Sequence, residues 1–455
     1  GTLSEKDINT SVRRILRLML GSRKMDNYAF SNAPDLRSNA RVTRESASEG
    51  MVLLKNEQVL PLKGSEKIAL FGVSSFEFIA GGTGSGDVNE AYTVSLQEGL
   101  INAGFAMDPN TAAAFESHKR NNPEAFIRPE GLEAMTNPYS PPQFVPRPDV
   151  LTRAVGEADI AIVTLGRNAG EGGDRVEKDD FLLTDMEKKL IQDVSEAFHG
   201  VGKKCIVVMN IGGVIETSSW KALPDAILLA WQGGQEGGNA VADILSGKVN
   251  PSGKLPMTFP VHLADHASSA NFPMDGEPIS FTDALFGVEE KAESEKIPNK
   301  DFTKYEEGIY VGYRHFDKND LDVSYPFGYG LSYTAFDMGA MEISTVDSSV
   351  AVGITVKNIG QVPGKEVIQI YSSLPETSID RPSRELRAFA KTPLLEPGDS
   401  TRIKMSVPVS ELSYWNEDRS DWEIEAGTYV LEAGTSSRDL RSSVSVEVGL
   451  PSEDQ

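Results

Sequence analysis

The strongest constraint on the fold is an alternation of short apolar runs with amphipathic segments between residues 42 and 260. The apolar runs are rich in Val, Ile and Leu and are expected to form buried strands at Ile68–Phe71, Ile160–Leu165, Cys205–Met209 and Ile227–Trp231. A helix is predicted from Thr184, where Glu187 completes a capping box. Its apolar face comprises Met186, Leu190, Ile191, Val194 and Phe198, and a second helix spans 237–247. Such alternation predicts a mostly parallel sheet with helices on both faces.

The pattern changes to a period of two from about residue 335. Short strands punctuated by Gly, Pro, Asn and Asp are expected at Val350–Val356, Glu366–Tyr371, Arg402–Val407, Thr428–Glu432 and Ser443–Val448. This spacing predicts an antiparallel sandwich of about 100 residues. Residues 262–304 lack either periodicity and include the charge-dense segment Glu289–Lys296, so we expect a solvated linker or surface loop there.

The first residues predict an amphipathic helix without a core of its own. Ser4 is a plausible N-cap with Asp7 three residues on, and Gly21 a plausible stop. The apolar stripe consists of Ile8, Val12, Ile15, Leu16 and Met19. Because the polar residues 22–41 offer nothing for this stripe to cover, we expect that the segment was cut from a larger unit or packs on a partner polypeptide.

Charge and composition restrict the partners. The chain has 44 Lys+Arg against 67 Asp+Glu, a formal net charge of −23, which argues against nucleic acid and anionic membranes as main partners and suits a neutral substrate. The single cysteine, Cys205, lies in an apolar run and is expected to be buried. The histidines lack metal-ligand spacing, and His262 and His266 are expected at the surface. No cofactor or metal is implied.

Two loops follow predicted strands, at the place where open α/β sheets bind ligands. The first is glycine-rich, Gly81–Asp87. Three interpretations are open: a phosphate cradle, a tight structural turn, or a sugar-contacting loop that uses the Ser85 hydroxyl and the Asp87 carboxylate. The absence of a following Gly-Lys-Ser/Thr counts against the phosphate cradle. A further run, Trp231–Gly234, fits packing and a turn better than a stacking platform.

The second loop, 167–175, follows the strand Ile160–Leu165 and contains Glu171 between glycines. A carboxylate held there gains little local packing, so Glu171 is a candidate proton donor, while a purely structural loop is the alternative. Asp174 and Arg175 are expected to form a local ion pair that shapes the loop. Position alone does not decide between these interpretations.

At these loops the sequence resembles glycoside hydrolase family 3, and in particular three-domain bacterial β-glucosidases. The similarity covers nearly the whole chain apart from 108–150 and the acidic linker. It is carried by long, ordered motifs: Glu49–Asn56, Gly81–Asp87, Gly170–Gly172 with Asp174 and Arg175, Trp231–Glu236, Asn250–Pro256, Tyr305–Arg314 and Phe327–Tyr333.

The resemblance implies a (β/α) barrel, then an α/β sandwich, then a fibronectin type III-like domain. It assigns residues 1–25 to the last barrel helix, 26–41 to a linker, 42–262 to the α/β sandwich with a mostly parallel sheet, 263–334 to a connecting region and 335–450 to the all-β fibronectin type III-like sandwich. The third domain is expected to buttress the assembly, with direct carbohydrate binding as the alternative.

The resemblance also implies a catalytic role for Glu171. The family's general acid/base aligns with Glu171, and Ser85 becomes the expected hydroxyl contact to the sugar. The family's nucleophilic Asp lies on the barrel, and no residue here matches its motif. Retaining hydrolysis needs two carboxyl groups about 5–5.5 Å apart. The second carboxylate must therefore come from an N-terminal barrel polypeptide, joined covalently or supplied as a separate chain.

The function expected from the resemblance is that of a retaining β-glucosidase. It would hydrolyse terminal β-D-glucosyl residues of oligosaccharides or aryl β-glucosides, with Glu171 protonating the leaving oxygen and then activating water. A β-xylosidase of the same family and a non-catalytic carbohydrate-binding or structural fragment are the alternatives. Association into a homo-oligomer stays open.

Overall fold

The computed structural model describes residues 3–88, 90–129, 139–169, 171, 175–271, 304–346 and 348–449. Contacts divide the chain into two units, residues 1–42 and 43–455. The acidic segment Glu289–Lys296 lies outside the described residues. Among the described residues, each helix is too short or too polar to cross a membrane.

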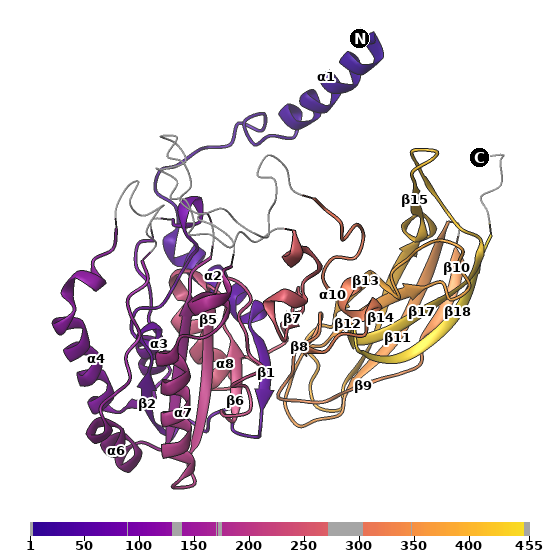
Figure 1. Ribbon diagram of the computed structural model, residues 1–455. Helices are drawn as coiled ribbons and strands as arrows, with labels where there is room; N and C mark the ends of the chain where they lie inside the picture. The colour runs from indigo at the N-terminus through magenta and orange to yellow at the C-terminus, as the bar shows by residue number, and fades with distance from the viewer. Residues whose placement is uncertain are drawn as a thin grey trace. The chain divides into compact units, whose positions relative to one another are not determined.

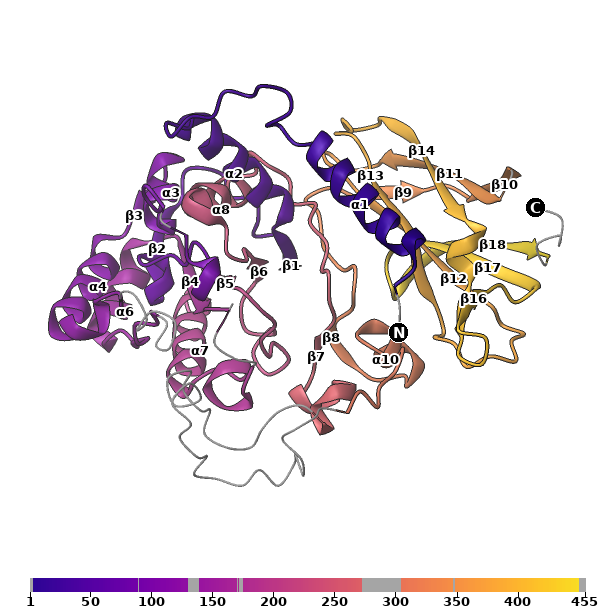
Figure 2. The same ribbon diagram turned by 90° about the horizontal axis from the view of Figure 1, so that it is seen from above.

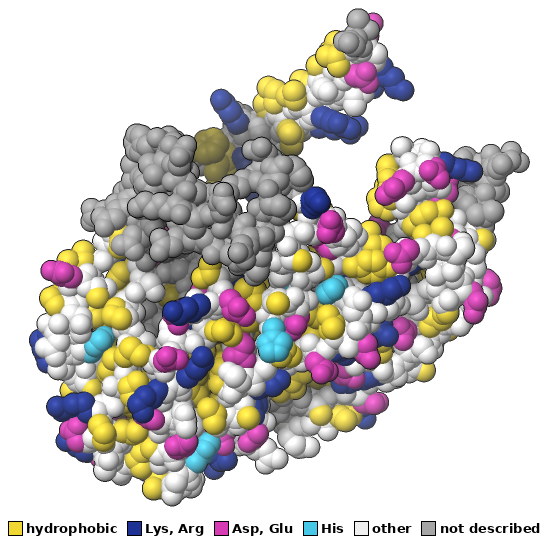
Figure 3. Space-filling model, in the orientation of Figure 1, with side chains coloured by type: hydrophobic (Ala, Val, Ile, Leu, Met, Phe, Trp, Pro, Cys, Tyr) yellow, Lys and Arg dark blue, Asp and Glu magenta, His cyan; other side chains and the backbone are white. Residues whose placement is uncertain are grey.

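The first unit contains the predicted amphipathic helix, α1 (Glu5–Leu20). Its N-cap is Ser4, whose Oγ accepts a hydrogen bond from Asp7 N at 3.2 Å, and its C-cap is Gly21, as the sequence predicted. All residues of α1 are exposed, including the apolar stripe, which is drawn in yellow on the helix at the top of Figure 3. Helix α2 (Leu36–Gly50) begins inside the segment expected to be a linker and continues into the second unit.

The second unit begins with a six-stranded sheet in the order β1-β6-β5-β4-β2-β3. Figure 1 labels β1, β2, β5 and β6, and Figure 2 labels β3 and β4 as well. Its strands are β1 (Val52–Asn56), β2 (Lys67–Phe71), β3 (Ala106–Met107), β4 (Ile160–Arg167), β5 (Lys204–Ile211) and β6 (Ala226–Leu229). All neighbouring pairs are parallel except β1 and β6. The predicted mostly parallel sheet is therefore confirmed, although β6 ends at Leu229, before Trp231.

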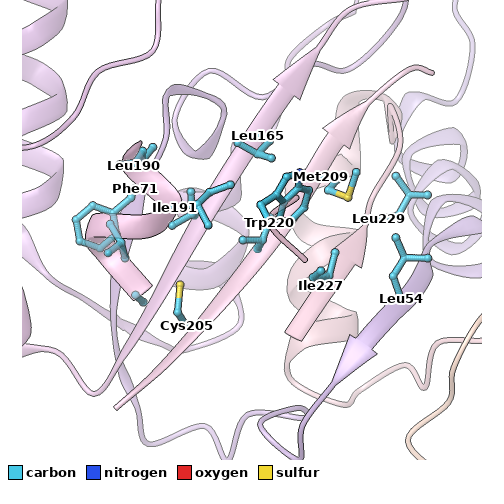
Figure 4. Packing of buried hydrophobic residues seen from close by; sticks show 14 of the residues in the cluster. Leu54, Phe71, Leu165, Leu190, Ile191, Cys205, Met209, Trp220, Ile227 and Leu229 are labelled. Atoms are coloured by element: carbon cyan, nitrogen blue, oxygen red, sulfur yellow. The ribbon is translucent and has the colours of Figure 1, made fainter. Parts of the chain in front are cut away.

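Helices cover both faces of this sheet (Figure 2). They are α3 (Leu96–Asn102), α4 (Pro109–Asn121), α6 (Pro148–Glu157), α7 (Asp185–His199) and α8 (Gly237–Leu245). Residues of α6 and α7 pack into the apolar cluster on one face, which Figure 4 shows, and residues of α3 and α8 into the cluster on the other face. Two buried layers against one sheet explain why its strands are mainly apolar on both faces.

Helix α7 matches the predicted capping box but not the whole predicted apolar face. Thr184 Oγ1 accepts from Glu187 N at 3.2 Å, and Leu190, Ile191, Val194 and Phe198 are buried. Met186 is 45 % exposed, so its assignment to the buried face was wrong. It lies in the first turn of the helix, where the preceding chain, not the helical period, decides which side is covered.

The connecting region contains α10 (Tyr313–Lys318) and β8 (Val323–Tyr325), which pairs with β7 (Phe259–Pro260) at the end of the α/β part. His262 is exposed, as predicted. His266 is half-buried, contrary to prediction, with its ring centroid 5.6 Å from that of Phe316. Burial lowers the pKa of His266 below its ordinary value.

The C-terminal part is the predicted antiparallel sandwich. One sheet contains β9 (Phe336–Met338), β10 (Glu342–Val346), β11 (Ser349–Asn358) and β14 (Ser400–Pro408), and the other β12 (Val367–Ser373), β13 (Glu385–Lys391), β17 (Gly427–Ser436) and β18 (Asp439–Val448). A separate hairpin pairs β15 (Tyr414–Asn416) with β16 (Asp421–Glu423). The core lies between the two main sheets and includes Val352, Ile370 and Leu431.

Charged contacts join the α/β part to the sandwich, and we call this region the junction: Glu49, Lys254, Lys365, Glu366 and Lys391. Glu49 accepts hydrogen bonds from Lys365 and Lys391. Lys254 Nζ lies 2.8 Å from Glu366 Oε1, and both side chains are nearly buried. Complementary pairing of these charges ties the two parts into one unit.

Candidate active site

The candidate site lies at the edge of the sheet where β2, β4, β5 and β6 end. These strands are mutually parallel, so the loops that follow them emerge on the same side. Backbone hydrogen bonds connect the loops: Thr83 N donates to Ala169 O at 3.0 Å, and Gly234 N donates to Ala80 O at 2.8 Å. The two loops that the sequence singled out are therefore in direct contact.

Glu171 is exposed on the loop after β4, and the glycine-rich loop holds it at two points. The Ser85 hydroxyl donates to the Glu171 carboxylate, and Thr83 Oγ1 donates to the Glu171 backbone oxygen at 2.7 Å. Thus the structure brings together Glu171 and Ser85, the site residues predicted from the resemblance. Within the described part of the chain, no Lys or Arg forms an ion pair with Glu171.

Close approach between the loops requires glycine at position 84. Gly84 has φ +66°, and a Cβ added there would lie 2.5 Å from Glu171 Oε2 and 2.6 Å from Glu171 Cβ. An L side chain at this position would be strained by its backbone conformation and would displace the carboxylate. The glycine at position 84 therefore leaves room for the Glu171 side chain.

The ends of the Glu171 loop are fixed by arginines. Arg167 donates two hydrogen bonds to the buried Glu187 carboxylate, and its Nε donates to Asp180 O at 3.1 Å. Burial opposes the Arg167 charge, but the Glu187 carboxylate outweighs this effect and raises the pKa of Arg167. Arg175, at the other end, donates to the Asp180 carboxylate. Asp174, its predicted partner, lies outside the described residues.

A pocket lies beside the glycine-rich loop. Its lining includes Thr83, Asp87, Glu90, Arg128 and Tyr139. The Arg128 guanidinium lies 4.6 Å from the Tyr139 ring centroid, and burial together with nearby Glu77 raises the pKa of Tyr139 to about 12. Asp87, the carboxylate that a sugar-contacting loop would use, lines this recess next to the Glu171 loop.

The other singled-out residues have structural surroundings. Trp231 has φ +53° and packs on the buried cluster near Phe259, which agrees with packing and a turn. Cys205 is fully buried, and burial raises its pKa to about 12. Among the described residues, His, Cys, Asp and Glu do not gather in a group suited to a metal ion.

Sequence reasoning missed Thr83 and Asn210 as residues that shape this edge. Thr83 lies inside the glycine-rich motif, but nothing in the sequence indicates that its hydroxyl forms a hydrogen bond with the backbone oxygen of Glu171. Asn210 is a polar residue at the end of an apolar run, and this signal could have marked it as a functional or bridging residue.

Two family models match the chain, one over the α/β part and the connecting region and one over the sandwich. Residues 51–333 match the glycosyl hydrolase family 3 C-terminal domain, and residues 366–437 match a fibronectin type III-like domain. The chain therefore belongs to glycosyl hydrolase family 3, which confirms the resemblance seen in the sequence.

Several similar proteins are named β-glucosidases. Beta-glucosidase A of Butyrivibrio fibrisolvens is 36 % identical over 447 residues, which cover 87 % of this chain and 49 % of the relative. Thermostable beta-glucosidase B of Acetivibrio thermocellus is 32 % identical, covering 98 % and 53 %. The structure of beta-glucosidase 3B from Thermotoga neapolitana with α-D-glucose has a TM-score of 0.84 at 39 % identity, covering 98 % and 59 %. The chain spans about half the length of the curated relatives it matches.

Proposed function

We propose that this chain supplies the general acid/base of a retaining β-glucosidase, and that Glu171 is that residue. The observation that carries the proposal is an exposed carboxylate at the carboxyl edge of the sheet, contacted by the Ser85 hydroxyl. A carboxyl group that exchanges protons with a substrate must be accessible, and it must not be locked as an anion by a cation. Membership of the family and the names of the relatives support the same role.

The first step of the proposed reaction breaks the glycosidic bond. A nucleophilic carboxylate attacks the anomeric carbon, while the protonated Glu171 gives its proton to the departing oxygen. The aglycone leaves as an alcohol, and a covalent glycosyl-enzyme remains. Glu171, now ionised, then removes a proton from water as the water attacks the same carbon. This second step releases β-glucose and restores both carboxyl groups to their starting states.

The nucleophile is proposed to lie on an N-terminal barrel polypeptide. A carboxyl separation of about 5–5.5 Å is required, and the family resemblance matches no residue of this chain to the nucleophile motif. The apolar stripe of α1 is exposed, as expected for a barrel helix considered without its neighbours. The proposed substrates are oligosaccharides or aryl glycosides with a terminal β-D-glucosyl residue.

The leaving-group dependence of Glu171→Gln tests the acid/base role in the chain combined with a barrel segment. We expect kcat/KM for cellobiose to fall by about 10²–10⁴-fold. An aryl glucoside with a good leaving group should lose less in the first step, since its oxygen needs little protonation. Added azide should restore part of the turnover by replacing the activated water.

The matched control is Glu177→Gln, because Glu177 is another exposed glutamate close by in the chain. It should leave the ratio of the two activities unchanged. Equal losses on both substrates in Glu171→Gln, without azide rescue, would refute the acid/base role. Turnover by the isolated chain would refute the placement of the nucleophile on the barrel.

A further inference from the structure

Asn210 forms a fully buried bridge at the end of β5. Its Oδ1 accepts a hydrogen bond from Ile79 N at 2.7 Å, and its Nδ2 donates to Ile79 O at 3.0 Å and to Trp231 O at 2.8 Å. One backbone N–H and two carbonyls face this amide, so only one orientation of the side chain satisfies all three groups. Asn210 therefore binds the loops after β2 and β6 to the central strand.

The Ile79 contact lies at the root of the glycine-rich loop. From Ile79 the chain runs to Ala80, which accepts a hydrogen bond from Gly234 N, and then to Thr83 and Ser85. Those two residues hold the backbone and the carboxylate of Glu171. Asn210 does not itself touch Glu171, but it fixes the segment that does.

The loop after β6, which Asn210 also contacts, begins in an unfavourable backbone conformation. Trp231 has φ +53°, which is uncommon for a residue with a bulky side chain. Its carbonyl is held by Asn210, and the next residue, Gln232, has its Oε1 2.7 Å from where a Cβ on Gly212 would lie. The same hypothetical Cβ would lie 2.6 Å from Ala169 Cβ, so Gly212, after β5, lies close to both this loop and the Glu171 loop.

We infer that Asn210 is a positioning residue for Glu171: it sets the height and angle of the glycine-rich loop and thereby the direction of the carboxyl group. The inference rests on the proposed function of Glu171. Asparagine is suited to this role because it offers one acceptor and two donor hydrogens in a plane. An aspartate of nearly the same size keeps the acceptor but, when ionised, presents no donor to the carbonyls of Ile79 and Trp231.

The test compares Asn210→Asp with Asn358→Asp in the chain combined with a barrel segment. Asn358 is a matched control because it is also fully buried. Its Oδ1 accepts from Thr334 and Gly360, and its Nδ2 donates to Val362 O and Leu395 O in the sandwich. Both substitutions remove buried donors, so both should lower stability. Only Asn210→Asp should change proton transfer.

The readout is the ratio of kcat/KM for cellobiose to that for an aryl glucoside with a good leaving group. A misplacement of about 1 Å can cost roughly a hundredfold in rate, so we expect the ratio to fall by at least about tenfold in Asn210→Asp. Asn358→Asp should leave it within about twofold of the parent, because distant sites act independently. Asn210→Ser, which retains one donor, should give an intermediate ratio and serves if the Asp variant does not fold.

Hydrogen exchange on the chain alone supplies a second readout. The amides of Ile79 and Thr83 should exchange faster in the Asn210 variants and be unchanged in Asn358→Asp. Faster exchange with an unchanged activity ratio would overturn the inference and leave Glu171 as the acid/base. An unchanged ratio in Glu171→Gln would instead overturn the proposed function on which the inference rests.

Discussion

Carboxylates at the sheet edge and at the junction have contrasting partners. At the junction, Glu49 contacts two lysines, and Glu366 forms a nearly buried pair with Lys254. At the sheet edge, the Glu171 carboxylate is exposed and receives a hydroxyl donor from Ser85. The same functional group is thus neutralised by cations in one region and left accessible in the other.

This difference separates two uses of a carboxylate. A cation beside an acid favours the ionised form and turns the pair into a structural contact. A neutral hydroxyl can donate to the anion and can rotate to accommodate the protonated acid. We therefore expect substitutions at the junction to change stability without changing chemistry, and substitutions of the exposed Glu171 and Ser85 to do the reverse.

The largest effect on stability is predicted for Lys254→Ala. It leaves the Glu366 carboxylate nearly buried without its cation and removes the hydrogen bond from Lys254 Nζ to Gly330 O, 2.7 Å long. Breaking a buried pair costs about 3–5 kcal/mol. Urea denaturation should show this loss in the free energy of unfolding.

The control is Lys248→Ala, which removes an exposed lysine 3.0 Å from Asp243. Asp243 is nearly buried but keeps two hydrogen bonds from Arg44, so loss of the exposed lysine should cost only about 0–1 kcal/mol. Similar losses in the two variants would break the comparison, since the junction would then have no special energetic role. The ratio of activities on the two glucosides should be unchanged in both.

A smaller effect, on chemistry alone, is predicted for Ser85→Ala. Loss of the hydroxyl should lower kcat/KM for cellobiose by about two- to tenfold, the range expected from about 0.5–1.5 kcal/mol per hydrogen bond. Thr428→Ala is the control, because Thr428 also donates from an exposed hydroxyl to a carboxylate, that of Glu447 in the sandwich. A drop of the same size in both variants would show that the Ser85 contact has no special role.

The smallest effect is predicted for Glu49→Gln, and it should depend on pH. Burial raises the pKa of Glu49, but hydrogen bonds and charge from Lys365 and Lys391 outweigh it, so the folded-state pKa is lowered. The stabilisation is therefore complete above the unfolded pKa of about 4.3 and is lost as pH falls through the folded value.

Denaturation midpoints from neutral to acid pH provide the measurement. The variant should be less stable than the parent near pH 7, and the difference should shrink as the pH falls below about 4.3. Solvent screening keeps the difference small, because 40 % of the Glu49 side chain is exposed. A difference that does not vary with pH would contradict the assignment of this carboxylate to charge pairing.

Much of the fold was predictable because local signals agreed with burial. The apolar runs became β2, β4, β5 and β6, and the capping residues Ser4 and Thr184 mark helix starts. Strand β13 was missed because its seven residues lie at a partly exposed face and lack a buried alternation. The exposure of Met186 depends on which neighbours cover the first turn, and periodicity does not contain this information.

The site was predictable only in part. The family resemblance pointed to Glu171 and Ser85, but their direct contact joins residues 86 positions apart. The Asn210 bridge to Ile79 spans 131 positions and involves backbone atoms of its partner, so the identity of residue 79 gives no sign of it. Contacts of this kind arise from strand order, which emerges only when the sheet is assembled.

A structure of the Glu171→Gln variant, assembled with the proposed barrel polypeptide and holding an uncleaved β-glucoside, tests the central claim most directly. The account predicts that the side chain at position 171 lies about 2.6–3.2 Å from the glycosidic oxygen. A side chain directed away from that oxygen, with the substrate otherwise bound productively, would contradict it.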